Sequence, residues 1–154
     1  MGENINYKEI NNLPYLNATV SETLRIYPIA AGTFGRIITK PTSIMGHNFE
    51  PKTWLMISIY SLHHREDLYP NAKEFKPERF LEKNYSPYEY IPFGGGHRRC
   101  IGSALALLEM KLVTATILPR FQLALTSKKP MFPVRRGLTL APPASFKIVV
   151  KSVN

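Results

Sequence analysis

The sequence is poor in cysteine, in acidic residues and in long apolar runs. Cys100 is the only cysteine, so no internal disulfide can form, and this favours a reducing, cytoplasmic location. No apolar run reaches the roughly 18 residues that a membrane-spanning helix needs, and the first residues, MGENINYKEINN, contain no apolar signal core. We therefore expect neither a membrane segment nor a secretion signal.

The charge of the chain is strongly one-sided. Acidic residues number 11 against 20 lysines and arginines, and the formal net charge is +9. A nucleic-acid-binding domain would gather such charges into a patch, but here the basic residues are scattered along the chain. We therefore expect no nucleic-acid partner, and a solvated basic surface is the simpler interpretation of the charge.

The stretch from Pro92 to Gly102, PFGGGHRRCIG, concentrates the unusual chemistry of the sequence. Glycine has no Cβ, so the run Gly94–Gly96 can take positive φ and lie flat against a large planar ligand. Cys100 can present a thiolate, the form that binds metal, and the helix expected directly after it would favour that charge. Arg98 and Arg99 offer cations to anionic groups at the edge of a cofactor. These features together suit an iron macrocycle with carboxylate tails.

Two other interpretations of Cys100 are weaker. A lone cysteine is usually a buried, inert thiol, but the glycines and arginines around this one favour a ligand. His97 and Cys100 have a spacing like that of a zinc finger, yet no second pair lies nearby in the sequence to complete four ligands.

Five positions, Phe93, Gly96, Arg98, Cys100 and Gly102, resemble the haem-binding signature of the cytochrome P450 superfamily, the haem-thiolate monooxygenases. The resemblance implies haem b as the cofactor and Cys100 as the proximal iron ligand. It also implies that Phe93 shields the sulfur and that Arg98 binds a haem propionate. The residues that it assigns to the cofactor are Phe93, Gly94, Gly96, Arg98, Cys100, Gly102 and, after a bend, Arg36.

Two upstream stretches resemble further motifs of the same family. ETLR lies on a helix expected from Pro14 to Tyr27, where Glu22 and Arg25 are three residues apart and share a face. FKPERF contains Arg79, which in the family joins that helix pair. The resemblance thus implies a structural triad in which two guanidiniums satisfy one carboxylate. Taken singly, each residue would be a solvated surface charge.

The expected fold class is α+β, as the C-terminal portion of the cytochrome P450 fold, in a single domain over residues 1–154. Its elements are the ExxR helix, a small antiparallel sheet, a proline-rich meander loop over Leu68–Pro92, the cysteine loop, a long helix ended by Pro119 and a C-terminal β-hairpin that turns at Gly137. The family places two of these segments beside the substrate. The implied pocket residues are Ile29, Ala30, Ala31, Thr33 and Leu138.

Finer expectations follow from local patterns. Residues 1–12 are polar and should be frayed, and Gly46–Asn48 should form a hairpin turn. The apolar run Trp54–Tyr60 indicates a buried strand, and His63 is expected to be a packed, hydrogen-bonded histidine. Further strands are expected over Phe121–Leu125 and Phe146–Val150.

The resemblance implies a monooxygenase that inserts one oxygen atom from O2 into a small apolar organic substrate. An acidic electron-transfer protein, such as a ferredoxin or a reductase, would supply electrons through a positive face. Two alternatives stay open because no stretch of this sequence matches the family's distal helices. The chain could be a truncated, non-catalytic haem-binding fragment, or a half that needs an N-terminal partner chain.

Overall fold

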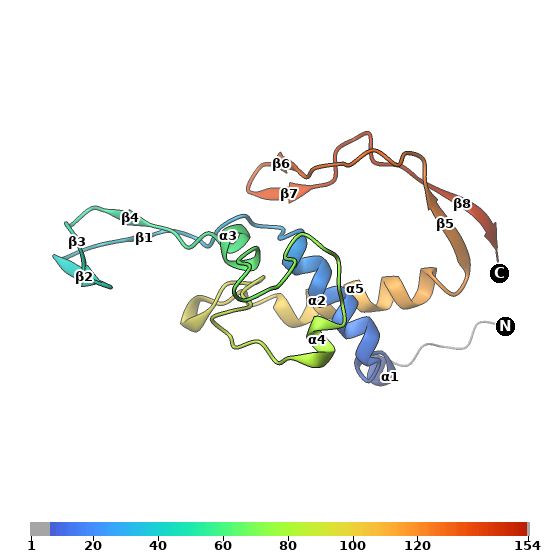
Figure 1. Cartoon of the computed structure of the whole chain (residues 1–154), viewed down its shortest axis with the longest axis horizontal. Coiled ribbons are helices and arrows are strands. Elements are labelled where there is room, and N and C mark those ends of the chain that lie inside the picture. The colour runs from blue at the N-terminus through green and yellow to red at the C-terminus, as the bar shows by residue number, and fades with distance from the viewer. Residues whose placement is uncertain (1–6, 154) are drawn as a thin grey trace.

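Two helices lie against each other at the centre of the molecule (Figure 1): α2 (Pro14–Ile26) and α5 (Ser103–Ile117). Pro14 starts α2, and Pro28 disfavours helical geometry in Tyr27, the residue at which the helix is capped. The periodic apolar residues of α2 face the core, where Val20 is 5% and Leu24 3% exposed. Proline placement therefore predicts both ends of α2 and the end of α5 to within two residues.

The structure is a computed structural model that describes residues 7–153, so part of the expectation of a frayed terminus lies outside the described residues. For the rest that expectation is wrong. Residues Tyr7–Asn11 form a short helix, α1, and the side chain of Ile10 is only 1% exposed. The Lys111 ammonium of α5 donates to the Asn11 side-chain oxygen over 3.2 Å. Burial of one apolar residue and contact with α5 thus order a stretch that is mostly polar.

A narrow arm extends to one side of the helices (Figure 1). It consists of β1 (Arg36–Ile37) paired with β4 (Trp54–Leu55), and of β2 (Thr42–Ile44) paired with β3 (His47–Phe49). The hairpin turn is Met45–Gly46, with φ of 49° and 81°, so the prediction that His47 and Asn48 belong to the turn is wrong. Positive φ at both central residues matches the twist of the flanking strands. The arm thus holds two separate strand pairs, not one sheet.

The predicted buried strand over residues 54–60 is also wrong. Only Trp54 and Leu55 are in a strand, and Trp54 is 62% exposed. The Ser58 hydroxyl accepts the Ser61 N–H at 3.1 Å and starts a short helix, α3 (Ile59–His63). A serine in the apolar run thus acts as a helix N-cap, which ends the extended segment.

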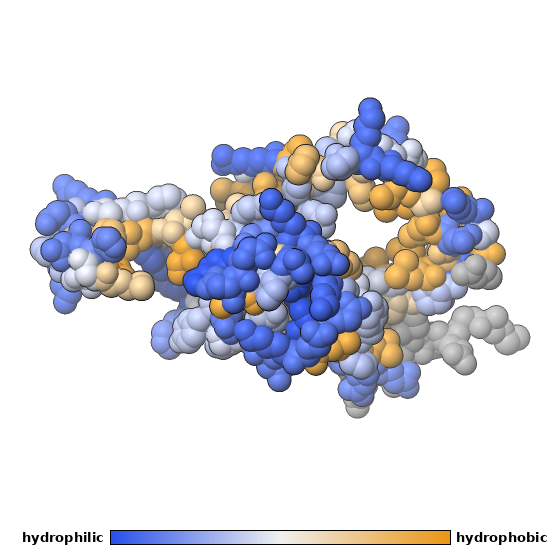
Figure 2. All heavy atoms as spheres, in the orientation of Figure 1, coloured by the Kyte–Doolittle hydropathy of each residue, from blue (hydrophilic) through white to orange (hydrophobic). Residues whose placement is uncertain are grey.

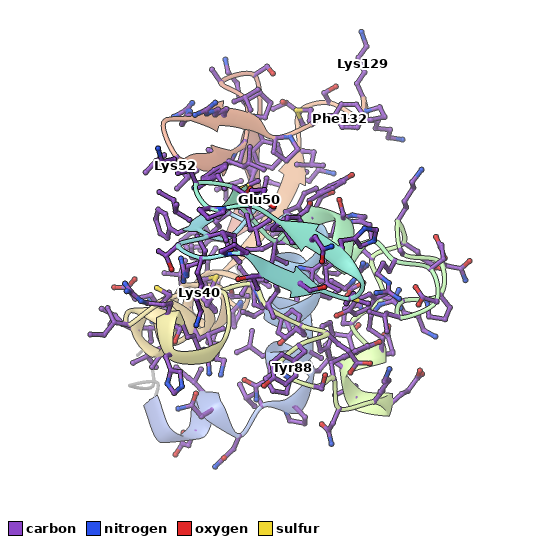
Figure 3. All side chains as sticks on the ribbon, turned by 90° about the vertical axis from the view of Figure 1, so that its left-hand side faces the viewer. Lys40, Glu50, Lys52, Tyr88, Lys129 and Phe132 are labelled. Carbon is purple, nitrogen blue, oxygen red and sulfur yellow. The ribbon has the colours of Figure 1, made fainter. Side chains whose placement is uncertain are left out.

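The chain after α3 is the meander loop expected from the prolines, interrupted by α4 (Arg79–Glu82) and followed by a short 3-10 helix, η1 (Gly96–Arg98). Part of the core lies between this loop and α2, where Tyr69, Ala72 and Ile91 are at most 5% exposed. Figure 3 looks along the arm, with Lys40, Glu50 and Lys52 on it and Tyr88 in the meander.

The C-terminal segment arches away from the helices (Figure 1). In it β5 (Phe121–Leu125) pairs with β8 (Ile148–Val153), and β6 (Val134–Arg136) pairs with β7 (Thr139–Ala141) in the expected hairpin through Gly137. The last strand begins two residues later than predicted. The Leu140 N–H donates to the Ile29 carbonyl at 2.6 Å and ties the hairpin to the chain that follows α2.

Apolar side chains remain uncovered along α5 and the C-terminal strands. In Figure 2 hydrophobic residues border an opening between the C-terminal segment and the helices. Exposed examples are Leu105 (60%), Val113 (54%), Leu125 (55%) and Val150 (56%). No side chain of α5 is fully buried, although the helix is predominantly apolar. Among residues 7–153 no helix has the length and apolar character needed to cross a membrane.

Candidate functional site

Cys100 lies on an exposed loop that connects η1 to α5, and its thiol is free. Its N–H donates to the Phe93 carbonyl at 3.0 Å, and its own carbonyl accepts the Ser103 N–H at 3.3 Å. The first contact closes the loop on itself, and the second joins it to the start of α5. The backbone of Cys100 is therefore held from both sides while its side chain stays accessible.

The glycines of this loop differ in backbone conformation and in the space around them. Gly94 and Gly96 have φ of 72° and 62°, a region that residues with a Cβ rarely adopt, and an added Cβ at either would point into open space. Gly102 differs, since its φ is −82° and an added Cβ would lie 3.9 Å from the Cys100 sulfur, an ordinary contact. The loop thus presents bare backbone on an open side next to an exposed thiol, which fits a flat macrocycle with a cysteine ligand.

The two arginines that the resemblance assigns to the cofactor lie in different parts of the structure. Arg98 ends η1, two residues before Cys100, and is exposed. Arg36 is on β1 of the arm, where its Nη1 donates to the carbonyls of Phe34 (2.9 Å) and Gly35 (3.1 Å). Arg98 is therefore adjacent to the candidate ligand, whereas the side chain of Arg36 is engaged by its own backbone segment.

Glu22, Arg25 and Arg79 meet in the core as three contacting side chains. Arg25 donates from Nε and Nη2 to the two oxygens of Glu22, at 2.7 and 2.8 Å. Arg79 donates from Nε to Oε1 of Glu22 at 3.0 Å. Burial opposes ionisation of Glu22, but the hydrogen bonds from the two guanidiniums and a backbone N–H outweigh it, so the pKa of Glu22 lies below its ordinary value.

The backbone of the meander completes this cluster. The Lys76 N–H donates to Oε1 of Glu22 at 2.9 Å, and Nη1 of Arg79 donates to the Pro70 carbonyl at 3.2 Å. Arg25 Nη1 donates to the carbonyl of His63, at the end of α3, at 2.7 Å. The triad therefore joins α2, α3 and the meander through charge-assisted hydrogen bonds, which have defined directions.

The five implied substrate-pocket residues fall on two segments that touch at one place. The hydrogen bond from Leu140 to Ile29 brings the hairpin that carries Leu138 next to the Ile29–Thr33 stretch. Ile29 (45% exposed) and Leu138 (78% exposed) remain open. The Ala31 carbonyl accepts the Tyr60 N–H at 3.1 Å, and the Thr33 hydroxyl accepts the Ile57 N–H at 3.2 Å. Ala30 is partly exposed in the same stretch.

Sequence reasoning missed two features beside the cysteine loop. An open pocket of about 540 Å³ lies between the loop, α2 and the end of the meander, and it is lined by residues that include Tyr88, Phe93, Gly95, Arg99 and Leu107. Outside the cysteine loop, the tyrosine-rich stretch 85–90 was its signal in the sequence. His63 is packed and hydrogen-bonded, as predicted, but its partner, the N–H of Ile91, was not foreseen.

The fold and this arrangement match one class of proteins. The family model described as Cytochrome P450 matches residues 1–150, and the chain belongs to the cytochrome P450 family. Haem b is the expected cofactor of a member of this family. The fold is the C-terminal part of the P450 fold, in agreement with the α+β class expected from the sequence.

The chain resembles particular members of the family over part of their length. It is 39% identical over 132 residues to cytochrome P450 9e2 from Blattella germanica, covering 82% of this chain and 25% of that protein. It is 37% identical to cytochrome P450 3A19 from Capra hircus aegagrus, covering 86% of this chain and 63% of that protein. The structure of the retinoic acid-bound cyanobacterial CYP120A1 superposes with a TM-score of 0.89 at 26% identity, covering 100% of this chain and 36% of the other. The chain therefore spans less than two thirds of the length of these relatives.

Proposed function

We propose that this chain forms the proximal, thiolate-bearing part of a cytochrome P450 monooxygenase, with Cys100 as the iron ligand. The observation that carries the proposal is the exposed Cys100 thiol on a loop whose glycines leave one side bare. Haem bound through a thiolate would supply the reductive activation of O2, from which one oxygen atom enters an organic substrate.

Several residues of the loop have a proposed role. Gly94 and Gly96 let the backbone lie flat beneath the macrocycle, and Phe93 shields the sulfur. Backbone N–H groups at the start of α5 moderate the charge of the thiolate. Arg98 binds a propionate. Gly102 leaves the start of α5 without a side chain next to the Cys100 sulfur. Arg36 reaches a second propionate only if it gives up its hydrogen bonds to the carbonyls of Phe34 and Gly35.

Catalysis requires more of the P450 fold than this chain spans. The exposed apolar residues of α5 and the C-terminal strands form a surface whose exposure to water is unfavourable. We propose that the remaining P450 segments cover this surface, either in the same polypeptide or as a separate N-terminal partner chain. A non-catalytic haem-binding fragment is the alternative, and it would bind haem without turnover.

The proposed partners follow from charge and from the pocket residues. The chain carries a net charge of +9, and exposed arginines lie at the cysteine loop, so an acidic ferredoxin or reductase is the expected electron donor. Ile29, Ala30, Ala31, Thr33 and Leu138 would contact a small apolar organic substrate. A cytoplasmic location also stays a prediction.

The decisive experiment is the absorption spectrum of the reduced, CO-bound chain reconstituted with haem. We expect a band at about 450 nm, the hallmark of thiolate ligation in this family, and its complete loss in Cys100→Ala. An unchanged band in Cys100→Ala would refute the assignment of the ligand. Turnover on addition of the missing P450 segments separates a split enzyme from a fragment that only binds haem.

A further inference from the structure

His63 contacts the ionic triad and the end of the meander that leads into the cysteine loop. Its backbone carbonyl accepts Nη1 of Arg25 at 2.7 Å, and its Nε2 lies 2.9 Å from the N–H of Ile91. The residue is fully buried, and its ring stacks on Tyr90 with centroids 5.4 Å apart. One residue thus contacts the triad through its backbone and the end of the meander through its side chain.

The contact at Ile91 continues into the loop that carries the thiol. The Ile91 carbonyl accepts the N–H of Gly94, one of the two glycines with positive φ, at 2.9 Å. The Phe93 carbonyl, between them, accepts the N–H of Cys100 at 3.0 Å. A short series of hydrogen bonds therefore runs from Arg25 through His63 and Ile91 to the backbone that holds Cys100.

The imidazole can serve this contact only in one form. Because the N–H of Ile91 is a donor, Nε2 must be the acceptor, which places the proton of the neutral ring on Nδ1. Nδ1 is buried and has no hydrogen-bond partner among the described residues 7–153. An unpaired buried Nδ1–H costs free energy. The ring is held in spite of this cost by its hydrogen bond from the Ile91 N–H and by aromatic packing.

We propose that His63 is a positioning residue for the cysteine ligand, acting through the Ile91 N–H. The triad fixes the His63 backbone, and the neutral imidazole accepts a hydrogen bond that sets where the Phe93–Cys100 loop begins. This inference rests on the proposed function for its haem readout, but its structural part can be tested without haem.

The test compares two substitutions at the same site. His63→Phe keeps a flat ring between Tyr69 and Tyr90 but has no acceptor, whereas the amide oxygen of His63→Gln can replace Nε2. The matched control is Tyr69→Phe, which removes another buried donor of the meander, the hydroxyl that bonds the Glu89 carbonyl at 2.9 Å. It leaves the His63 contact with Ile91 intact.

Backbone hydrogen exchange of the chain without haem is the first readout. We expect the amides of Ile91 and Gly94 to exchange about tenfold faster in His63→Phe, with α2 amides unchanged and with near-normal protection in His63→Gln. Equal protection of Ile91 in His63→Phe and the parent would overturn the proposal. If His63→Phe does not fold, nitrogen NMR of the parent decides, because an Nε2–H tautomer of His63 would also overturn it.

The second readout is the CO-bound spectrum of the haem-loaded chain. We expect His63→Phe to lose most of the band at about 450 nm, while His63→Gln and Tyr69→Phe retain it. Absence of the band in the parent would count against the proposed function, and hydrogen exchange would still decide the role of His63. A band of full intensity in His63→Phe would show that His63 does not position the ligand.

Discussion

Glu22 and Arg79 are joined by a 3.0 Å hydrogen bond between side chains that are 57 residues apart in sequence and almost completely buried. Arg25 pairs with the same carboxylate from the next turn of α2. A buried ion pair of this kind contributes little net stability because both charges lose water, but it permits only one arrangement of the groups. We infer that its main effect is to hold the meander at one position on α2.

Removing the carboxylate should destabilise the fold strongly. Glu22→Gln leaves two buried guanidiniums without a counter-charge, and we expect the free energy of unfolding to fall by about 3–5 kcal/mol in urea denaturation. The control is Glu82→Gln, whose side chain is 64% exposed and pairs with Lys76 at 3.8 Å. Its effect should stay below about 0.5 kcal/mol. Equal effects of the two substitutions would contradict a structural triad.

Stability should fall in mild acid because His63 is buried as the neutral form. Burial lowers the pKa of His63 to about 4 from an ordinary value of 6.5. The unfolded chain then binds a proton that the folded chain does not, so the free energy of unfolding decreases as the pH falls from 6.5 to 4. A shift of this size corresponds to a loss of roughly 3 kcal/mol at most.

The lowered pKa of Glu22 also makes the free energy of unfolding decrease, but at lower pH. The ionised Glu22 stabilises the folded chain, and this contribution is lost as the carboxylate becomes protonated. Urea denaturation at a series of pH values separates the two groups. In His63→Gln the slope between pH 6.5 and 5 should become nearly flat, while the loss below the ordinary pKa of Glu22 should persist. A parent profile that is flat across the whole range would show that His63 is not buried as the neutral form.

A side chain at Gly35 should displace the indole of Trp54 in the arm. An added Cβ at this position would overlap the indole of Trp54, the only tryptophan, so Gly35→Ala must displace that ring. We expect a changed emission spectrum of Trp54, with a loss of stability of about 1 kcal/mol or less because the indole is already half exposed. Gly95→Ala is the control, since its added Cβ would lie 3.6 Å from the Pro87 carbonyl oxygen, an ordinary distance. Identical emission in Gly35→Ala and the parent would mean that the ring does not pack on Gly35.

The thiol of Cys100 should report cofactor binding directly. It is free and exposed, so one thiol per folded chain should react rapidly with a coloured disulfide reagent, and Cys100→Ser should not react. Haem bound through the sulfur should slow this reaction by at least about tenfold. A reaction that requires denaturant would indicate a buried thiol, and an unchanged rate with haem would count against thiolate ligation.

Local features of the chain were predictable because they depend on neighbours in sequence. Pro14 and Pro28 set the limits of α2, and the spacing of Glu22 and Arg25 placed them on one face of it. The hairpin through Gly137 and strand β5 followed in the same way. Apolar character alone misled at Trp54–Tyr60, where the Ser58 cap and the lack of a covering layer outweigh strand propensity. At α1 the polar composition predicted a frayed segment, but burial of Ile10 orders it as a helix.

The sequence by itself determined the chemistry of the candidate site, since one thiol, a glycine run and a following helix are adjacent in the chain. Only the tertiary structure decided which distant groups hold that loop and the segments around it. The contacts of His63 with Ile91, of Leu140 with Ile29 and of Arg79 with Glu22 join residues far apart in sequence. Such contacts depend on the path of the intervening loops, which local periodicity does not encode.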